Sequence, residues 1–302
     1  MTLAAIILTL NEEKHLERCI SSLDGVVDTV FVVDCYSTDR TLEIAKLRGV
    51  IVKQHPWTNH AAQFNWALSQ LDSSVDWVLR IDADEYLTPE LALEIQKKLA
   101  IVEEETEGIY LRRRMAFMGK MIGYGGVFPV EILRLFRNGA GKCESRWMDE
   151  HIKVEAGTVV FENELIDDNL NPLSWWIDKH NKYASREVVD ILNREHGFMY
   201  YDSVASLSDG SQASTKRWIK ENVYSKLPIG AGPLLYFVYR YFIRFGFLDG
   251  KEGAAFHFLQ GFWYRYLVDL KLMEVNKYIK LNQCNVTVAI KEVLDINIEG
   301  AS

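Results

Sequence analysis

The sequence predicts an α/β protein with a mainly parallel sheet flanked by helices. Apolar runs of strand length alternate with segments whose apolar residues repeat at helical spacing. This alternation is typical of right-handed β-α-β crossovers and a parallel sheet. The chain has 302 residues, of which 48% are hydrophobic and 25% charged, so it can bury a sizeable core.

The first 81 residues predict four strands with helices between them. Residues 3–10 form a continuous apolar run, and Asn11 is positioned to cap a helix with Leu16, Ile20 and Leu23 on one face. Further strands are expected at residues 29–34, 50–55 and 77–81, with a helix that follows the capping residues 37–39 and ends at Arg48, and another at residues 59–71.

After residue 108 the pattern predicts a mixed sheet and then a long helix. Strands are expected at residues 109–118 and 131–138, and the helix at residues 174–196. We therefore place a first domain, which contains the sheet, at residues 1–200. A mainly helical, aromatic-rich region follows at residues 201–302.

Composition excludes several classes of protein. The net charge of −8 argues against a nucleic-acid binder, which would carry a basic excess. The four cysteines lie far apart and form no C-x-x-C pair, which favours a reducing compartment. The apolar start lacks the preceding basic segment of a signal peptide, and no apolar run reaches the roughly 18 residues of a spanning helix. We expect a cytoplasmic protein.

Residues 224–266 hold 14 of the 36 aromatic residues, interleaved with Lys226, Arg240, Arg244 and Arg265. Two interpretations are open. The segment can lie on an anionic membrane surface, because long basic side chains beside aromatic rings suit the headgroup level. Alternatively, the aromatic side chains form the core of a helical subdomain.

Three carboxylates, Asp82, Asp84 and Glu85, follow the predicted strand at residues 77–81. Clustered acids at a strand end repel one another unless a cation joins them, and their oxygens suit Mg²⁺ or Mn²⁺ completed by substrate phosphates. If the strand continues, alternation puts Asp82 and Asp84 on one side, as candidates for a shared ion. A solvated acidic turn is the other interpretation.

Polar residues also follow the first two predicted strands. Thr9, Asn11 and Glu12 end the first, and Asp34 and Ser37 end the second. Ligands of open α/β sheets sit outside the carboxyl ends of the strands, where an acid can accept a hydrogen bond from a ribose hydroxyl or a base N–H. Each group could instead be a helix cap. Three polar strand ends on one sheet edge together predict a binding site.

Three segments, in order, resemble the motifs of family 2 glycosyltransferases. They are Ile-Leu-Thr-Leu-Asn-Glu-Glu at 7–13, Val-Asp-Cys-Tyr-Ser-Thr-Asp-Arg-Thr at 33–41 and Asp-Ala-Asp-Glu at 82–85. Residues 134–137 and 247–253 resemble the bacterial branch that builds lipopolysaccharide core or surface polysaccharide. The resemblance implies a GT-A fold, a nucleotide-sugar donor with UDP favoured, a divalent cation (Mg²⁺ or Mn²⁺) and inversion at the anomeric carbon.

The resemblance also implies roles for individual residues. Thr9, Asn11 and Glu12 would border the nucleotide, and Asp34 would contact the base. Asp82 would lie near the ribose or phosphate, and Asp84 would hold the metal.

Basic side chains further along the chain are candidates for phosphate contacts. Arg112 and Arg114 would point together from one strand face, toward a diphosphate or an anionic acceptor. Solvated strand faces explain most such runs. Lys179 and His180 lie in a segment that resembles the helix after the catalytic acid in this branch, so they are candidates to contact phosphate.

Inversion by direct displacement needs a base that takes the proton of the acceptor hydroxyl. Residues 147–151 (Trp-Met-Asp-Glu-His) are the best candidate segment, because relatives carry an acid in a comparable place. We favour Glu150 over Asp149.

We therefore expect a metal-dependent inverting glycosyltransferase with a glycan, lipid-linked or lipopolysaccharide acceptor, peripheral on the inner face of the cytoplasmic membrane. One alternative is a nucleotidyltransferase of similar fold, which is disfavoured because no glycine-rich basic loop follows the first strand. The other is a noncatalytic sugar-binding module, which would have little reason to keep metal-ligand spacing.

Overall fold

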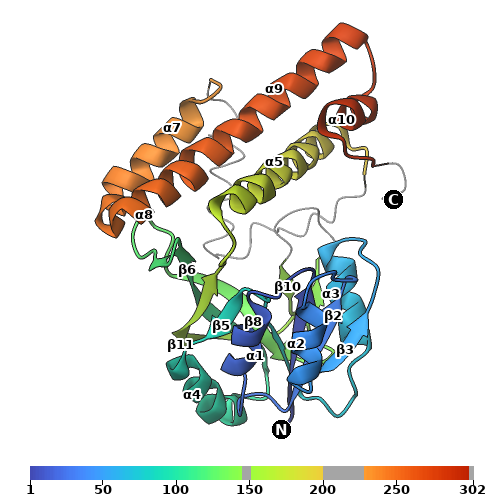
Figure 1. Ribbon diagram of the computed structural model, residues 1–302, viewed down its shortest axis with the longest axis vertical. Coiled ribbons are helices and arrows are strands. Elements are labelled where there is room, and N and C mark those ends of the chain that lie inside the picture. Colours follow the sequence, from blue (N-terminus) through green and yellow to red (C-terminus); the bar gives the residue numbers. More distant parts are fainter. Residues whose placement is uncertain (145–150, 200–227, 299–302) are drawn as a thin grey trace. The chain divides into compact units, whose positions relative to one another are not determined.

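The computed structural model describes residues 1–144, 151–199 and 228–298, and these form two compact units. Unit 1 comprises the described residues up to 171 and contains the sheet, and unit 2 comprises those from 172 onward and is helical (Figure 1). This division differs from the expected boundary at residue 200. The reason is that α5 (Leu173–His196) packs against helices further along the chain.

The four strands predicted in the first 81 residues are present and run parallel. The central strand β1 (Leu3–Thr9) pairs with β2 (Thr29–Asp34) on one side and β4 (Trp77–Arg80) on the other. β3 (Ile51–Gln54) pairs with β2, which gives the order β3-β2-β1-β4. Because these strands are parallel, their carboxyl ends share one edge of the sheet.

The remainder of the sheet is mixed, as predicted. β8 (Val130–Arg137) is antiparallel to β4 and to β6 (Thr106–Phe117). β11 (Gly157–Asp168) is parallel to β6 and antiparallel to β5 (Glu85–Leu87), and the sequence pattern missed both β11 and β5. The short pairs are β7 (Lys120–Met121) with β6, and β9 (Lys142–Cys143) with β10 (Ile152–Lys153).

Helices cover both faces of the parallel strands. Leu3, Ala5 and Ile7 of β1 point to one face, where α1 (Leu16–Ser22), α2 (Thr41–Leu47) and α4 (Pro89–Lys98) pack. Ile6 points to the other face, against α3 (His60–Ser69). Because successive strand residues face opposite ways and both faces are covered, β1 is apolar from Leu3 to Leu8. The predicted α/β fold class is confirmed.

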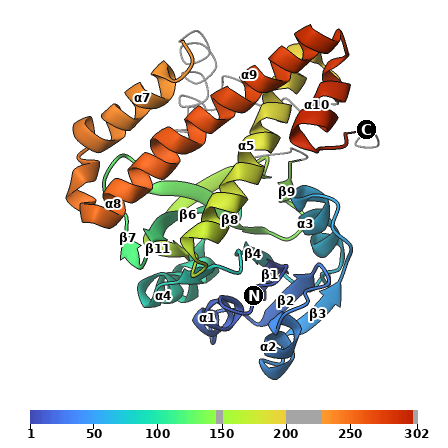
Figure 2. The ribbon, with the colours of Figure 1, turned by 45° about the horizontal axis from the view of Figure 1, so that its top comes forward.

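The predicted helix at residues 174–196 is confirmed as α5. It packs with α9 (Tyr264–Asn282) and α10 (Val286–Leu294) around a core that includes Val188, Val275 and Ile290. α7 (Ala231–Val238) lies alongside the first part of α9 in both views (Figure 2), and α8 (Gly250–Phe256) lies between them in sequence. Among the described residues, no helix is long and apolar enough to cross a membrane.

Candidate functional site

The carboxyl ends of β1 and β2 are joined by the buried carboxylate of Asp34. Thr9 Oγ1 donates to Asp34 Oδ1 at 3.0 Å, and the Ser37 hydroxyl donates to the same oxygen. Asp34 Oδ2 accepts from the Ser37 backbone N–H at 2.9 Å and from Gln54 Nε2 at 3.1 Å. A carboxylate offers about four acceptor positions, so these donors satisfy it. Asp34 thus positions the loop after β2, and a contact with a base would have to displace one of these donors.

The loops after β1 and β2 hold each other in place. The Asn11 backbone N–H donates to Ser37 Oγ at 2.8 Å, and Asn11 Oδ1 accepts from the Thr38 backbone N–H at 2.8 Å. The prediction that Asn11 caps α1 is wrong, because its side chain bonds the neighbouring loop and α1 begins after His15. Asn11 has a left-handed backbone (φ 59°), which asparagine tolerates well.

Glu12 is oriented by a buried histidine. His15 Nδ1 lies 2.6 Å from Glu12 Oε2, and His15 Nε2 accepts from the Leu170 backbone N–H at 2.9 Å. Because Nε2 accepts, the proton of the neutral ring lies on Nδ1 and is donated to Glu12. The Glu12 backbone N–H donates to Thr41 Oγ1 at 2.8 Å. The side chain expected to border the nucleotide is therefore held in one place.

Asp82 and Asp84 lie in a tight turn and not on a continuing strand. β4 ends at Arg80, and the Glu85 backbone N–H donates to the Asp82 carbonyl at 2.9 Å, which closes a β-turn. Because the strand does not continue past Arg80, strand alternation does not place Asp82 and Asp84 on one side. Asp82 contacts arginines, whereas Asp84 Oδ2 accepts from Asn169 Nδ2 at 2.9 Å.

Arg134 on β8 bridges two of the three acids. Its Nη2 donates to Asp82 Oδ2 at 2.7 Å and to Glu85 Oε1, and the Asp82 backbone N–H donates to Glu85 Oε2 at 3.0 Å. Arg80 Nε lies 3.8 Å from Asp82 Oδ1. Glu85, the first residue of β5, is 1% exposed, and these partners compensate for the burial of its carboxyl group.

The same network sets the protonation of its members. Burial raises the pKa of Glu85 to about 7, although Arg134 acts to lower it. Burial also opposes ionisation of Asp82, but Arg134 and Arg80 together hold the pKa of Asp82 well below its usual range. Burial and the nearby Arg80 lower the pKa of His60 to about 4, so the His60 ring is neutral at pH 7.

Asp84 is the acid best placed to hold a divalent cation. No described residue donates to its Oδ1, whereas Asp82 Oδ2 already bonds Arg134, which would compete with a metal ion. Within the described chain, no three His, Cys, Asp or Glu side chains are grouped to hold a metal. Mg²⁺ or Mn²⁺ would fit with one carboxylate from the protein, because such ions take their other oxygens from phosphates and water.

Strand β6 points Arg113, not Arg112, at the acidic turn. Arg113 Nη1 lies 4.0 Å from Glu85 Oε1 and 3.5 Å from Asp167 Oδ2. Arg112 faces the other way, and its Nε lies 3.8 Å from Glu131 Oε1. The expected alternation along the strand is present, but it places Arg113 next to the acids, in contrast to the prediction that favoured Arg112.

Four further candidates belong to unit 2 or lie outside the described residues. Glu150 and Asp149 lie outside the described residues. Lys179 and His180 lie on α5 in unit 2, where Lys179 Nζ is 4.7 Å from the Trp175 ring centroid and His180 stacks on Trp176 at 3.5 Å. Burial lowers the pKa of His180 to about 4. Their contact with phosphate stays a prediction.

Two side chains beside the acidic turn were missed in the sequence. His60 begins α3 directly after its cap, Asn59, and lies 3.2 Å from Arg80 Nη2, whereas Asn169 directly follows the unpredicted strand β11 and contacts Asp84. Neither position carries a local signal, because each contact joins segments that are far apart in the chain. Arg113 could have been found from the alternation along β6, which places its side chain on the face of the strand opposite to that of Arg112.

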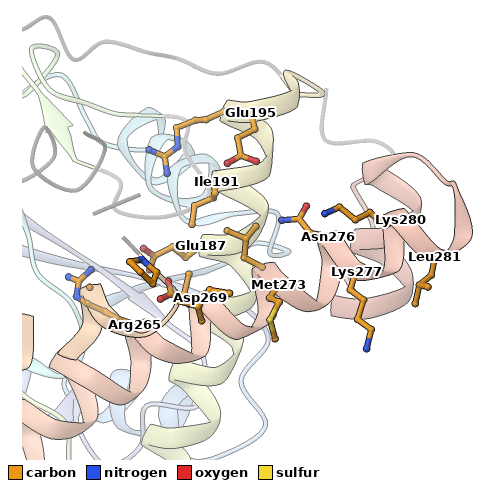
Figure 3. A pocket seen from close by; sticks show the side chains of 16 residues that line it. Glu187, Ile191, Glu195, Arg265, Asp269, Met273, Asn276, Lys277, Lys280 and Leu281 are labelled. Carbon is orange, nitrogen blue, oxygen red and sulfur yellow. The ribbon is translucent and has the colours of Figure 1, made fainter. Parts of the chain in front are cut away.

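Unit 2 contains a cavity of about 980 Å³ between α5, α7 and α9 (Figure 3). Its walls combine apolar side chains such as Ile191 and Met273 with charges of both signs. Glu187 Oε2 accepts from the Tyr264 hydroxyl at 2.7 Å, and Asp269 Oδ2 accepts from the Gly230 backbone N–H at 3.1 Å. Of the predicted site residues that the structure describes, none lines this cavity.

The mainly parallel sheet, with helices on both faces and polar loops at one edge, defines an enzyme of the α/β class, and comparison with known proteins identifies its family. Residues 4–122 match the model of glycosyl transferase family 2. The lipopolysaccharide core biosynthesis glycosyltransferase LpsC of Rhizobium meliloti is 34% identical over 202 residues, which cover 61% of this chain and 70% of LpsC. An uncharacterized glycosyltransferase of Rickettsia typhi is 27% identical over 97% of this chain and 95% of its own length. The chain belongs to glycosyl transferase family 2, and the prediction of a glycosyltransferase is confirmed.

Solved structures match a smaller part of the chain. Glucosyl-3-phosphoglycerate synthase from Mycobacterium tuberculosis, solved with Mn²⁺, UDP and glucosyl-3-phosphoglycerate, is 23% identical with a TM-score of 0.32. Mannosyl-3-phosphoglycerate synthase from Rubrobacter xylanophilus is 22% identical with a TM-score of 0.34. The matches cover 38% of this chain and less than half of either solved chain, 44% and 41% respectively.

Proposed function

We propose that this glycosyltransferase moves a sugar from a nucleotide-sugar to a lipid-linked or lipopolysaccharide acceptor, with a divalent cation and with inversion at the anomeric carbon. The observation that carries the proposal is the convergence of three strand ends on one edge of the sheet. The Asn11 and Ser37 loops interlock there, and the acidic turn at Asp82 and Asp84 follows the neighbouring strand. Open α/β sheets bind nucleotides at such an edge.

The nucleoside is proposed to lie against the loops after β1 and β2. Thr9, Asn11, Glu12 and Ser37 supply polar groups whose positions are fixed by hydrogen bonds between the loops. A prearranged pocket of this kind loses little conformational entropy on binding. Asp34 is proposed to act by holding these loops.

The diphosphate is proposed to lie by the acidic turn, with the cation on Asp84. When bound, the cation would offset the negative charge that develops on the departing diphosphate. Arg113 is the arginine of β6 whose charge lies next to this turn, 4.0 Å from Glu85. Asp82 is held ionised by Arg134 and Arg80, and we propose that it orients the ribose or phosphate.

Inversion by one displacement requires a carboxylate on the face of the sugar opposite the leaving group. We propose that Glu150 takes the proton of the acceptor hydroxyl as that oxygen attacks the anomeric carbon and the nucleoside diphosphate departs. Asp149 is the alternative base. The Trp-Met-Asp-Glu-His segment at residues 147–151 supports this assignment, because relatives carry an acid in a comparable place.

The acceptor and location are proposed from the family resemblance and from the relative named for lipopolysaccharide core biosynthesis. The proposed acceptor of this enzyme would carry a lipid anchor. We therefore propose that the enzyme works as a peripheral protein on the inner face of the cytoplasmic membrane. UDP is the nucleotide that the family resemblance favours.

A thermal-shift panel of UDP, GDP and dTDP, each with Mg²⁺, Mn²⁺ or EDTA, tests the donor proposal. A ligand that binds only the folded protein at 100 times its Kd raises stability by about 2.7 kcal/mol. We expect UDP to raise Tm in the presence of Mn²⁺ or Mg²⁺ and to have little effect in EDTA. If no nucleotide shifts Tm with either metal, the proposed donor site is wrong.

A further inference from the structure

In unit 2, α7 forms a helical hairpin with α8 and α9. This hairpin exposes an unusual number of large apolar side chains. On α7 and the π-helical turn after it (Tyr239–Ile243), exposed residues repeat in pairs four positions apart. Three more follow before α8 begins. We call this set the apolar tip; its exposed fractions are Leu234 52%, Leu235 58%, Val238 38%, Tyr239 47%, Phe242 55%, Ile243 62%, Phe245 55%, Phe247 44% and Leu248 53%. Single exposed apolar residues are ordinary, but a contiguous set marks an interaction surface.

The tip rests on a tightly packed base built by the glycines near Phe247-Leu248-Asp249-Gly250-Lys251-Glu252-Gly253. A Cβ on Gly246 would lie 2.6 Å from the His257 ring, and a Cβ on Gly253 would overlap Asp249. Arg240 is 2% exposed and donates to Gln260 Oε1 at 2.9 Å. These contacts fix the hairpin, so the motif explains how the tip is held but not why its aromatic residues are exposed.

Phe245 is exposed to solvent although its backbone conformation is strained. Its φ of 59° lies in the left-handed region, which is a rare conformation for a bulky residue, and its side chain is 55% exposed. Strained residues persist where the surrounding structure enforces them, and they concentrate at functional sites. The hairpin thus holds a strained phenylalanine in solvent when a small polar residue would relieve the strain.

The charges around the tip are basic on the outside. Arg244 is exposed and Lys251 has a 92% exposed side chain, whereas Asp249 is 4% exposed. Glu252 lies 3.8 Å from Lys251 and has a 23% exposed side chain. On a chain of net charge −8, this is a local positive surface. It therefore complements an anionic partner.

We propose that the apolar tip docks this enzyme on an anionic lipid bilayer, with Phe242, Phe245, Phe247 and Leu248 among the acyl chains and Arg244 and Lys251 at the headgroups. The inference rests on the proposed function at a membrane and names the surface responsible. A second copy of the chain fits less well, because a symmetric contact would bring the same basic residues of both copies together. Apolar burial combined with basic attraction is how interfacial helices bind anionic lipid.

Vesicle flotation of the full chain tests the proposal. We expect the protein to float with phosphatidylcholine vesicles that contain phosphatidylglycerol, to bind more weakly to phosphatidylcholine alone, and to bind less as salt is added. In the double variant Phe242→Ser/Phe245→Asn, vesicle affinity should fall at least tenfold. Asparagine suits the left-handed backbone at 245, so this variant should keep its fold.

Matched controls test whether vesicle binding depends on the apolar tip or on exposed apolar side chains in general. Leu47→Ser/Ile101→Ser changes two side chains of unit 1 that are 76% and 79% exposed, and it should bind vesicles as the parent does. Arg244→Glu and Lys251→Glu should each lower affinity for the anionic vesicles by about fivefold. Equal loss in the control pair and the tip pair would overturn the proposal, as would parent protein that ignores anionic vesicles at low salt.

The binding of UDP and Mn²⁺ gives a second readout that distinguishes this inference from the donor proposal. The tip variants should bind UDP and Mn²⁺ as the parent does. If the parent fails to bind any nucleotide but floats with vesicles through the tip, the donor proposal fails and the docking surface stands. If the tip variants change only a monomer–dimer equilibrium in analytical ultracentrifugation, a second copy covers the tip and the docking proposal is wrong.

Discussion

Arg134 is the residue on which the acidic turn depends. Its guanidinium contacts Asp82 and Glu85, and Arg80 and Arg113 lie within 4.0 Å of the same two carboxylates. Buried ion pairs add little net stability compared with apolar residues, but loss of one partner leaves a buried charge uncompensated. The geometry of the turn therefore depends on β8, a strand more than forty residues further along the chain.

Replacement of Arg134 with leucine should lower the free energy of unfolding by about 3–5 kcal/mol, the usual effect of breaking a buried pair. Urea unfolding monitored by circular dichroism measures the change. The double variant Arg134→Leu/Glu85→Gln should recover part of the loss, because the amide cannot carry the uncompensated charge. A loss below about 1 kcal/mol for Arg134→Leu would show that the network is not needed for folding.

The proposed base can be tested at the same scale. Glu150→Gln should keep nucleotide and metal binding and reduce sugar transfer by roughly 10²–10⁴-fold, because the amide is nearly isosteric but cannot accept the proton. Asp149→Asn is the matched control and should keep most of the transfer rate. Transfer of radiolabelled sugar to a lipopolysaccharide fraction measures both.

The outcomes of that pair are informative in either direction. If Asp149→Asn is the inactive variant, the base lies one residue earlier and the mechanism survives. If both variants retain full transfer, the base lies outside residues 147–151.

At the scale of elements, the sequence predicted what short-range patterns control. Apolar periodicity located β1, β2, β3 and β4, and it located the helix α3, which Asn59 caps with its Oδ1 accepting from the Ala62 backbone N–H at 2.8 Å. β5 was missed because its three residues carry no period of their own. β11 was missed because most of its first half is exposed. β5 pairs with β11, and β11 also pairs with β6, and no local pattern encodes such pairing between distant segments.

The packing of the hairpin in unit 2 gives a prediction about an element. Gly246→Ala should destabilise the protein by about 1–3 kcal/mol, because the new Cβ would meet the His257 ring at 2.6 Å and the Arg240 carbonyl oxygen at 2.9 Å. Gly261→Ala is the control, since its Cβ would meet Arg240 at an ordinary 3.5 Å. Thermal unfolding of the two variants compares them, and equal stability would contradict the close packing described.

At the scale of the whole molecule, the order of strands along the sequence predicted that the loops after β1 and β2 and the acidic turn lie at one edge of the sheet. Parallel strands with right-handed crossovers place their carboxyl ends together, so Asp34 and Asp82 were expected near each other before any distance was known. Their partners were not predictable in this way. Arg134, Asn169 and Gln54 meet these acids through register and side-chain packing between segments far apart in the chain.

The domain boundary illustrates the same limit. The aromatic-rich composition located a distinct C-terminal region, but composition does not say which helices pack with it. α5 joins α9 and α10 through Val188, Val189 and Leu192, which puts the boundary at residue 171. The described part of residues 224–266 contains both buried and exposed aromatic side chains, since Phe256 is buried and Phe242 is exposed.

Calorimetric titration of UDP in the presence of Mn²⁺ tests the central claim, a metal-dependent nucleotide site built on the acidic turn. The parent protein should bind UDP with Mn²⁺ and lose most of that affinity in EDTA. Asp84→Ala should remove the effect of Mn²⁺, because the variant lacks the carboxylate that would bind the cation. The circular dichroism spectrum and the Tm without ligand should remain near those of the parent, because Asp84 is partly exposed and its loss removes no core contact. If Asp84→Ala binds UDP and Mn²⁺ as tightly as the parent does, the cation does not lie on Asp84 and the account of the site is wrong.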